Sequence, residues 1–208
     1  MIIKRAIYLF LPLFFSINAS GQINIYLGGN LQGNYSWIRG DERTFQPGFG
    51  GGFSFVYWEY EYWFLKAGID YSYKSSSALE LPENFDVPIT SPEDRVRITF
   101  TEQCIGVPLT VYFRPFESGD NTLLITGSFA MLYVANLKEN TEEYGELVLS
   151  GNEITTRTKT NVGVGVGYQR QLDQHLFLNI YPSYNMDIRA ERAFNTINIT
   201  AELIFGVY

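Results

Sequence analysis

Histidine is the side chain that most often serves as a general base, and this chain of 208 residues has one, His175. It lies in the segment 171–175, which we expect to be a short turn at the end of the molecule away from the longest connections. A base must lie within hydrogen-bond distance of its partners. We therefore expect His175 to be a solvated turn residue, with no catalytic residues, and the chain not to be an enzyme.

Two acidic segments, 75–95 and 137–156, carry carboxylates that could collect calcium or bridge lipopolysaccharide phosphates through divalent ions. Neither segment has a fixed ligand spacing, so we expect a solvated acidic surface and no metal site. The acids concerned are Glu80, Glu83, Asp86, Glu93, Asp94, Glu139, Glu142, Glu143, Glu146 and Glu153.

Other features exclude several further classes of function. The glycines at 163, 165 and 167 have the spacing of a dinucleotide loop, but they lie in an alternating segment that no helix follows, so no cofactor is expected. The formal net charge of −7 argues against a nucleic-acid partner. Cys104 is the single cysteine and forms no internal disulfide. No apolar run after the first 20 residues approaches 18, which excludes helical membrane spans.

Charged residues also lie on the polar side of alternating segments. Lys66 and Asp70 are four residues apart on one such segment, and at about 3.3 Å per residue their backbones are roughly 13 Å apart. Each therefore needs a partner from another strand. We expect Glu202 to pair with Lys66, and Asp187 or Asn185 to belong to a network with Asp70. These charges form an expected structural network inside a closed lumen.

The strands that would position these charges are clearest in the last segments of the chain, where apolar and polar residues alternate. Each of these two segments has about a dozen residues, and roughly 9–11 tilted residues cross a bilayer. The alternation extends to earlier segments and predicts an all-β, eight-stranded, antiparallel up-and-down transmembrane barrel. The predicted strands are 23–31, 48–57, 63–73, 96–113, 122–136, 161–169, 176–188 and 196–207.

The connections between the strands alternate between longer and shorter, which is typical of outer-membrane barrels with long loops outside the cell. Glycines occupy many inward positions, because an eight-stranded barrel has little room inside. The longer connections are 32–46, 75–95, 137–156 and about 189–195; the shorter ones are 58–61, 114–121 and 171–175.

The fourth strand is irregular. Its apolar positions are even at Ile98 and Phe100 and odd from Ile105 onward, so we expect a β-bulge at 102–104. Pro108 has no N–H group and predicts a second fault in the ladder. On the fifth strand, Leu124, Leu132 and Val134 are expected to point inward. Aromatic girdles are expected at both water boundaries. Their residues are Tyr57, Trp58, Tyr62, Trp63 and Tyr112 at one, and Tyr71, Tyr73, Phe100 and Tyr184 at the other.

The N-terminal segment has the pattern of a secretory signal. Lys4 and Arg5 precede the apolar stretch 6–17, and small residues follow. We expect a signal peptide at 1–21 and a barrel domain at 22–208.

The segment 103–113, with sequence QCIGVPLTVYF, resembles the fourth strand of the PorT-like outer-membrane β-barrel family of Bacteroidota, most closely at Val107, Pro108 and Leu109. The resemblance implies an integral outer-membrane protein. We expect both termini in the periplasm and the long loops outside the cell. The expected partners are outer-membrane lipid, the barrel-insertion machinery and an envelope or secretion-complex protein.

The expected function is therefore non-enzymatic: an envelope structural component, or an accessory of a surface or secretion complex, that displays acidic loops. Two alternatives stay open. An outer-membrane enzyme acting on lipid would need polar side chains clustered at the outer-leaflet rim. A soluble lipocalin-like barrel would point its apolar face inward around an apolar ligand.

Overall fold

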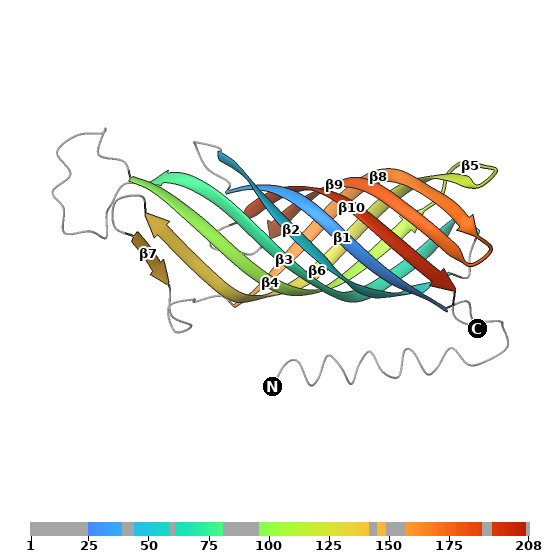
Figure 1. Ribbon diagram of the computed structural model, residues 1–208, viewed down its shortest axis with the longest axis horizontal. Coiled ribbons are helices and arrows are strands. Elements are labelled where there is room, and N and C mark those ends of the chain that lie inside the picture. Colours follow the sequence, from blue (N-terminus) through green and yellow to red (C-terminus); the bar gives the residue numbers. More distant parts are fainter. Residues whose placement is uncertain are drawn as a thin grey trace.

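The computed structural model describes residues 25–38, 44–58, 61–80, 96–141, 145–148, 157–188 and 193–206. They form one closed antiparallel β-barrel (Figure 1), which confirms the predicted eight-stranded all-β fold. Two short strands, β5 (Glu117–Ser118) and β7 (Gly145–Val148), pair with the ends of β6. The wall consists of β1 (Ile25–Ile38), β2 (Thr44–Tyr57), β3 (Trp63–Glu80), β4 (Val96–Phe113), β6 (Asn121–Thr141), β8 (Thr158–Asp173), β9 (Leu176–Ile188) and β10 (Phe194–Gly206).

Each wall strand pairs with its neighbour in the chain, and β1 closes the barrel against β10. The start of β1 and the end of β10 lie at the same end as β5 and the β8–β9 turn, which we call the turn end. The opposite end, where β7 lies, is the loop end. Among the described residues, no helix is long and apolar enough to cross a membrane. The expected signal peptide and most of the acidic segments lie outside the described residues.

Several strands are longer than alternation predicts. β1 continues to Ile38, β3 to Glu80 and β6 to Thr141, so parts of the expected loops 32–46, 75–95 and 137–156 are strand. The alternation fades there because both faces carry polar residues, as in the three serines at 75–77. The backbone ladder continues regardless of side-chain type, and these serines pair with residues 99–101 of β4.

The expected irregularity at 102–104 is present, but it belongs to the neighbouring strand. Gln103 pairs with Asn136 and Cys104 with Val134, so Ala135 of β6 is the extra residue. The ladder between β4 and β3 has no register shift at this place. A bulge in β6 leaves β4 with a single parity along its whole length.

This parity corrects three orientations. Ile98 and Phe100, with exposed fractions of 7% and 0%, point into the barrel, and so does the fully buried Tyr112. The prediction that the first two face outward, and that Phe100 and Tyr112 belong to outer girdles, is wrong. The β3–β4 ladder lapses beside Pro108, as the missing N–H group predicts. The expected inward orientation of Leu124 is confirmed.

Two apolar layers cross the interior. The turn-end layer includes Val56, Phe64, Leu124, Phe177 and Ile204. Trp58, which we expected in an outer girdle, packs against this layer instead. The loop-end layer consists of Ile98, Phe100 and Phe194 with Ile38 packed against it.

Glycines on the two faces of the wall have different surroundings. A Cβ atom added to Gly68 would collide with the backbone of β2, including a contact of 2.9 Å to the Cα atom of Ser54. A Cβ atom added to Gly33 would meet nothing within 4 Å. The absence of a side chain is therefore required at Gly68 by the approach of a neighbouring strand and is not required at Gly33.

We predict that Gly68→Ala lowers the free energy of unfolding by about 1–3 kcal/mol, because the added methyl group forces strands apart. Gly33→Ala is the matched control and should change it by less than about 1 kcal/mol, or raise it, because alanine is less costly than glycine in a strand. Urea unfolding of the barrel in detergent measures both. Equal losses in the two variants would contradict this account of the inner glycines.

Candidate functional site

The candidate site is the charged interior of the barrel. Its first part lies next to the turn-end apolar layer, on the side toward the loop end. Lys66 of β3 points inward, and its Nζ atom lies 2.9 Å from the Oε1 atom of Glu202 on β10. The two side chains are 3% and 0% exposed. The structure therefore brings together the pair expected from the sequence.

Both oxygens of Glu202 have partners. Tyr112 donates a hydrogen bond of 2.9 Å to Oε2, and Asn179 donates one of 3.0 Å to the same atom. The Tyr181 hydroxyl lies 3.0 Å from the Tyr112 hydroxyl, and the Lys66 ammonium lies 5.7 Å from the Tyr112 ring centroid. We call these five residues the turn-end network. A buried carboxylate with this many donors is well compensated.

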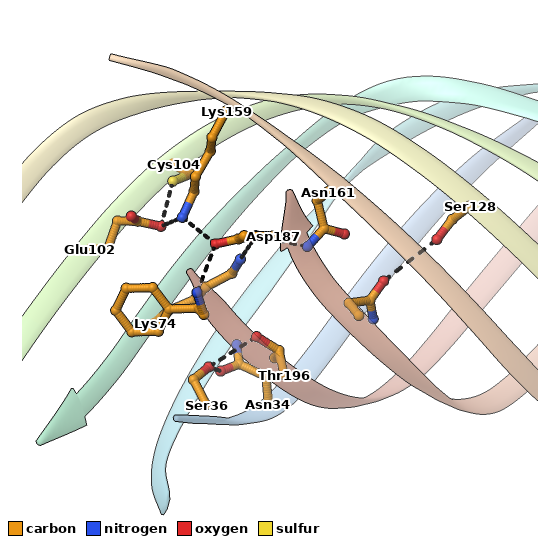
Figure 2. A network of polar contacts seen from close by, with 12 residues as sticks. Asn34, Ser36, Lys74, Glu102, Cys104, Ser128, Lys159, Asn161, Asp187 and Thr196 are labelled. Atoms are coloured by element: carbon orange, nitrogen blue, oxygen red, sulfur yellow. Dashed lines mark hydrogen bonds and ion pairs between the residues drawn. The ribbon is translucent and has the colours of Figure 1, made fainter. Parts of the chain in front are cut away.

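A second cluster, the loop-end network, lies nearer the loop end of the barrel. Figure 2 shows it from close by. Lys159 of β8 contacts Glu102 and lies 2.5 Å from the Oδ2 atom of Asp187. Lys74 lies 3.4 Å from Oδ1 of Asp187, and Asn161 donates a 2.8 Å hydrogen bond to the same oxygen. All five side chains are buried. Two ammonium groups and two carboxylates therefore neutralise one another.

Asp70 joins neither network. Its Oδ1 atom accepts a 3.0 Å hydrogen bond from Asn30, whereas Asp187 belongs to the loop-end network and Asn185 donates to Ser183. The expected network of Asp70 with Asp187 or Asn185 is therefore wrong. The stagger of the strands around the ring brings Asp187 to the level of Lys74 instead. Lys74 lies two inward positions beyond Asp70 on β3.

Sequence analysis missed Lys74, Lys159 and Glu102 as members of the site. The signal for the first two is present: Lys74 continues the inward positions of Lys66 and Asp70, and Lys159 precedes the inward Asn161. Both lie just beyond the ends of the predicted strands. Glu102 was obscured because the irregularity of the ladder was assigned to its own strand.

A chamber of about 100 Å³ lies between the two networks. We call it the central chamber. Its wall carries amide and hydroxyl groups together with Lys66, Asp70 and Lys74. The inner glycines make room for these side chains, since a Cβ atom at Gly52 would collide with the carboxylate of Asp70.

The charged groups in the two networks neutralise one another, as expected of a structural role. Cys104 is buried and donates a 3.0 Å hydrogen bond to Glu102, whose carboxylate also contacts Lys159. His175 lies exposed in the β8–β9 turn and belongs to neither network. Within the described ranges, no three His, Cys, Asp or Glu side chains lie together as metal ligands would.

No protein-family model matches the chain. No curated protein matches it by sequence. Among solved structures, the chain is similar to Neisserial surface protein A, with a TM-score of 0.54, 12% identity and coverage of 88% of this chain and 97% of that chain. This likeness shows the barrel fold. A weaker likeness is to Ail of Yersinia pestis, with a TM-score of 0.44, 14% identity and coverage of 89% and 100%.

We predict that Lys66→Met and Glu202→Gln each lower the free energy of unfolding by about 3–5 kcal/mol, because each leaves an uncompensated buried charge. The double variant should recover part of this loss. Urea unfolding in detergent of the four proteins measures the coupling. As a control, Lys66→Met combined with Asp173→Asn in the exposed β8–β9 turn should show additive effects. Additive losses for Lys66 and Glu202 themselves would contradict the pairing.

Proposed function

We propose that the chain is an integral outer-membrane barrel with a closed lumen, which displays loops at the cell surface and serves as an envelope structural component or as an accessory of a surface or secretion complex. The observation that carries the proposal is the distribution of side chains across the wall. Large apolar side chains face outward, and charged and polar ones are buried inside. A β-barrel with this arrangement matches lipid outside and polar groups inside.

The outward apolar belt is extensive. Phe53 is 82% exposed and Leu31 is 75% exposed, and similar side chains cover every wall strand. Exposed aromatic residues lie toward both ends, including Tyr62 and Trp63 at the turn end and Tyr184 nearer the loop end. Contiguous apolar surface of this size is rare on proteins in water. It supports a lipid environment for the belt.

The orientation we propose follows from the connections. An even number of strands places both ends of the wall at the turn end, with the shorter connections. Outer-membrane barrels have short turns in the periplasm and longer loops outside the cell. Both termini would therefore be periplasmic and the acidic segments extracellular.

The role as an accessory rests on the sequence resemblance to PorT-like barrels. Expected partners are outer-membrane lipid, the insertion machinery during assembly and a further envelope or secretion-complex protein. Proteins that co-purify with the detergent-extracted barrel would identify the last of these. Recovery of the barrel alone under mild extraction would favour a structural role without a complex.

The two alternatives have less support. A lipocalin-like barrel would line its cavity with apolar side chains, whereas the central chamber is lined mainly by polar ones. An enzyme acting on lipid needs a base at the loop-end rim, and the single histidine lies at the turn end. Loss of a measured lipase or acyltransferase activity on mutation of loop-end residues would favour the enzyme over our proposal.

We predict that the mature protein stays in the outer-membrane fraction through high-salt and carbonate washing, because roughly 25 cal/mol per Å² over a lipid-facing belt exceeds any peripheral contact. Fractionation followed by immunoblotting measures this. Release of the protein by carbonate would contradict an integral barrel.

A substitution on the outward apolar belt distinguishes a lipid environment of the belt from an aqueous one. Phe53→Arg should lower unfolding stability in phospholipid vesicles by about 2–4 kcal/mol if it lies near the bilayer mid-plane. The same change on a water-exposed surface would cost less than about 0.5 kcal/mol.

We also predict that the barrel shows no large steady single-channel currents in a planar bilayer, because networks and apolar layers close both ends of the lumen. At the turn end, the Cζ atom of the Arg114 guanidinium also lies 4.7 Å from the ring centroid of Trp58. A porin inserted under the same conditions provides the positive control. Large steady currents from the wild-type barrel would contradict the closed lumen.

A further inference from the structure

The wall of the barrel is not equally tall on all sides. β3, β4 and β6 extend furthest toward the loop end, beside β7 (Figure 1). On β4 the outward apolar side chains end at Ile105, and the outward positions that follow are Gln103, Thr101, Thr99 and Arg97. Arg97 lies eight positions beyond Ile105. On this side, therefore, a polar stretch of strand continues the wall beyond the apolar belt.

Three basic side chains face outward beyond the belt. Arg97 is exposed at an outward position of β4. Lys138 of β6 pairs with Thr101 and therefore shares its outward face. Arg157, directly before β8, is exposed, and its Nη1 atom donates a hydrogen bond of 3.4 Å to the hydroxyl of Tyr133, at the loop-end edge of the belt. We call Arg97, Lys138 and Arg157 the basic patch.

The basic patch has no counterpart on the other side of the barrel. β1, β2, β9 and β10 contain no Lys or Arg, and the two lysines of β3 point inward. Among the described side chains at outward positions of β4, β6 and β8 beyond the belt, none is acidic. Positive charge on the described outer wall at the loop end is thus confined to β4, β6 and the start of β8.

This position favours phosphorylated lipid headgroups as the ligand. Basic side chains just beyond an apolar belt lie where the hydrocarbon core of a membrane meets water, and there they attract anionic lipids. The Arg157 guanidinium, beside the Tyr133 hydroxyl, lies at this boundary. A guanidinium offers paired donors that match the geometry of a phosphate group. The basic patch therefore faces the headgroups of lipids that lie against β4, β6 and β8.

The height of the polar wall indicates which kind of lipid it meets. At about 3.3 Å per residue and a tilt of roughly 40°, the stretch from Ile105 to Arg97 rises about 20 Å. The headgroup layer of an ordinary bilayer adds only about 5–8 Å on each side of the hydrocarbon core. A phospholipid headgroup would reach the level of Arg157 and not that of Arg97. A lipid with a taller, phosphorylated sugar headgroup would reach both.

We propose that the basic patch binds a phosphorylated glycolipid of the lipopolysaccharide type from the outer leaflet. Its acyl chains lie on outward apolar side chains of β4 and β6, such as Val107 and Met131, which are 55% and 57% exposed. Its phosphates contact Arg157 first, and Lys138 and Arg97 further from the belt. This inference rests on the proposed function, which places the loop end outside the cell, and it names a specific lipid partner for one side of the barrel.

The first test compares two ligands on the wild-type barrel. Rough-type lipopolysaccharide with a phosphorylated inner core, and the same material after removal of its phosphates, are titrated onto the detergent-purified protein and counted by native mass spectrometry. The phosphorylated form should bind at least about tenfold more tightly, and the difference should shrink with added salt. Equal binding of the two forms would overturn the proposal. Tighter binding of phosphatidylglycerol than of the phosphorylated form would overturn the choice of a glycolipid.

Variants then locate the binding surface. Arg97→Gln, Lys138→Gln and Arg157→Gln should each weaken binding of the phosphorylated form by about fivefold, and the triple variant should weaken it by well over tenfold. Arg170→Gln is the matched control, because Arg170 is an exposed outward arginine of β8 at the turn end, and it should change binding by less than about twofold. A triple variant that binds as tightly as the wild type would overturn the assignment to this patch.

Insertion into vesicles separates this proposal from the proposed function. A barrel that inserts into phosphatidylcholine vesicles and resists carbonate, yet binds both forms of lipopolysaccharide equally, would overturn the basic patch and leave the integral barrel standing. A barrel that does not insert into vesicles would contradict the integral barrel, and the lipid-binding patch with it.

Discussion

The burial of charge inside a closed barrel is the constraint on which this structure depends. A charge buried in the interior loses its contact with water, so a fully buried one needs a partner from the protein. Of the four ion pairs described inside the barrel, one joins the neighbouring strands β8 and β9, between Lys159 and Asp187. The other three are Lys66 of β3 with Glu202 of β10, Lys159 of β8 with Glu102 of β4, and Lys74 of β3 with Asp187 of β9. None of these three pairs joins neighbouring strands, so they brace the barrel across its interior where the backbone ladder cannot.

The same constraint explains the glycines of the inner face. Eight strands enclose a lumen barely wide enough for side chains, so a long polar residue on one strand requires a small one beside it. Gly50 lies against Gln32, Gly52 against Asp70, and Gly163 against Asn185. The glycine-rich segments of β2 and β8 therefore leave the space that the polar side chains lining the central chamber occupy.

These side chains are arranged in order along the barrel axis. From the turn end, an apolar layer is followed by the turn-end network, the central chamber, the loop-end network and a second apolar layer. β3 alone contributes Phe64, Lys66, Asp70 and Lys74 to the first four of these in sequence order. The described part of the barrel thus has an apolar cluster toward each end and a polar chamber between them.

The sequence by itself determined the inward face of most strands, because side chains alternate along any strand and the two faces meet different surroundings. It predicted the eight strands, the pair of Lys66 with Glu202 and the irregularity near Gln103. It could not determine the partners of Asp70 and Asp187, the inward position of Phe100, or the strand that carries the bulge. Those depend on the stagger of strands around the closed ring, which relates residues far apart in the chain and has no local pattern. Only the tertiary structure decided that Asp187 lies beside Lys74 and that Asp70 faces an open chamber.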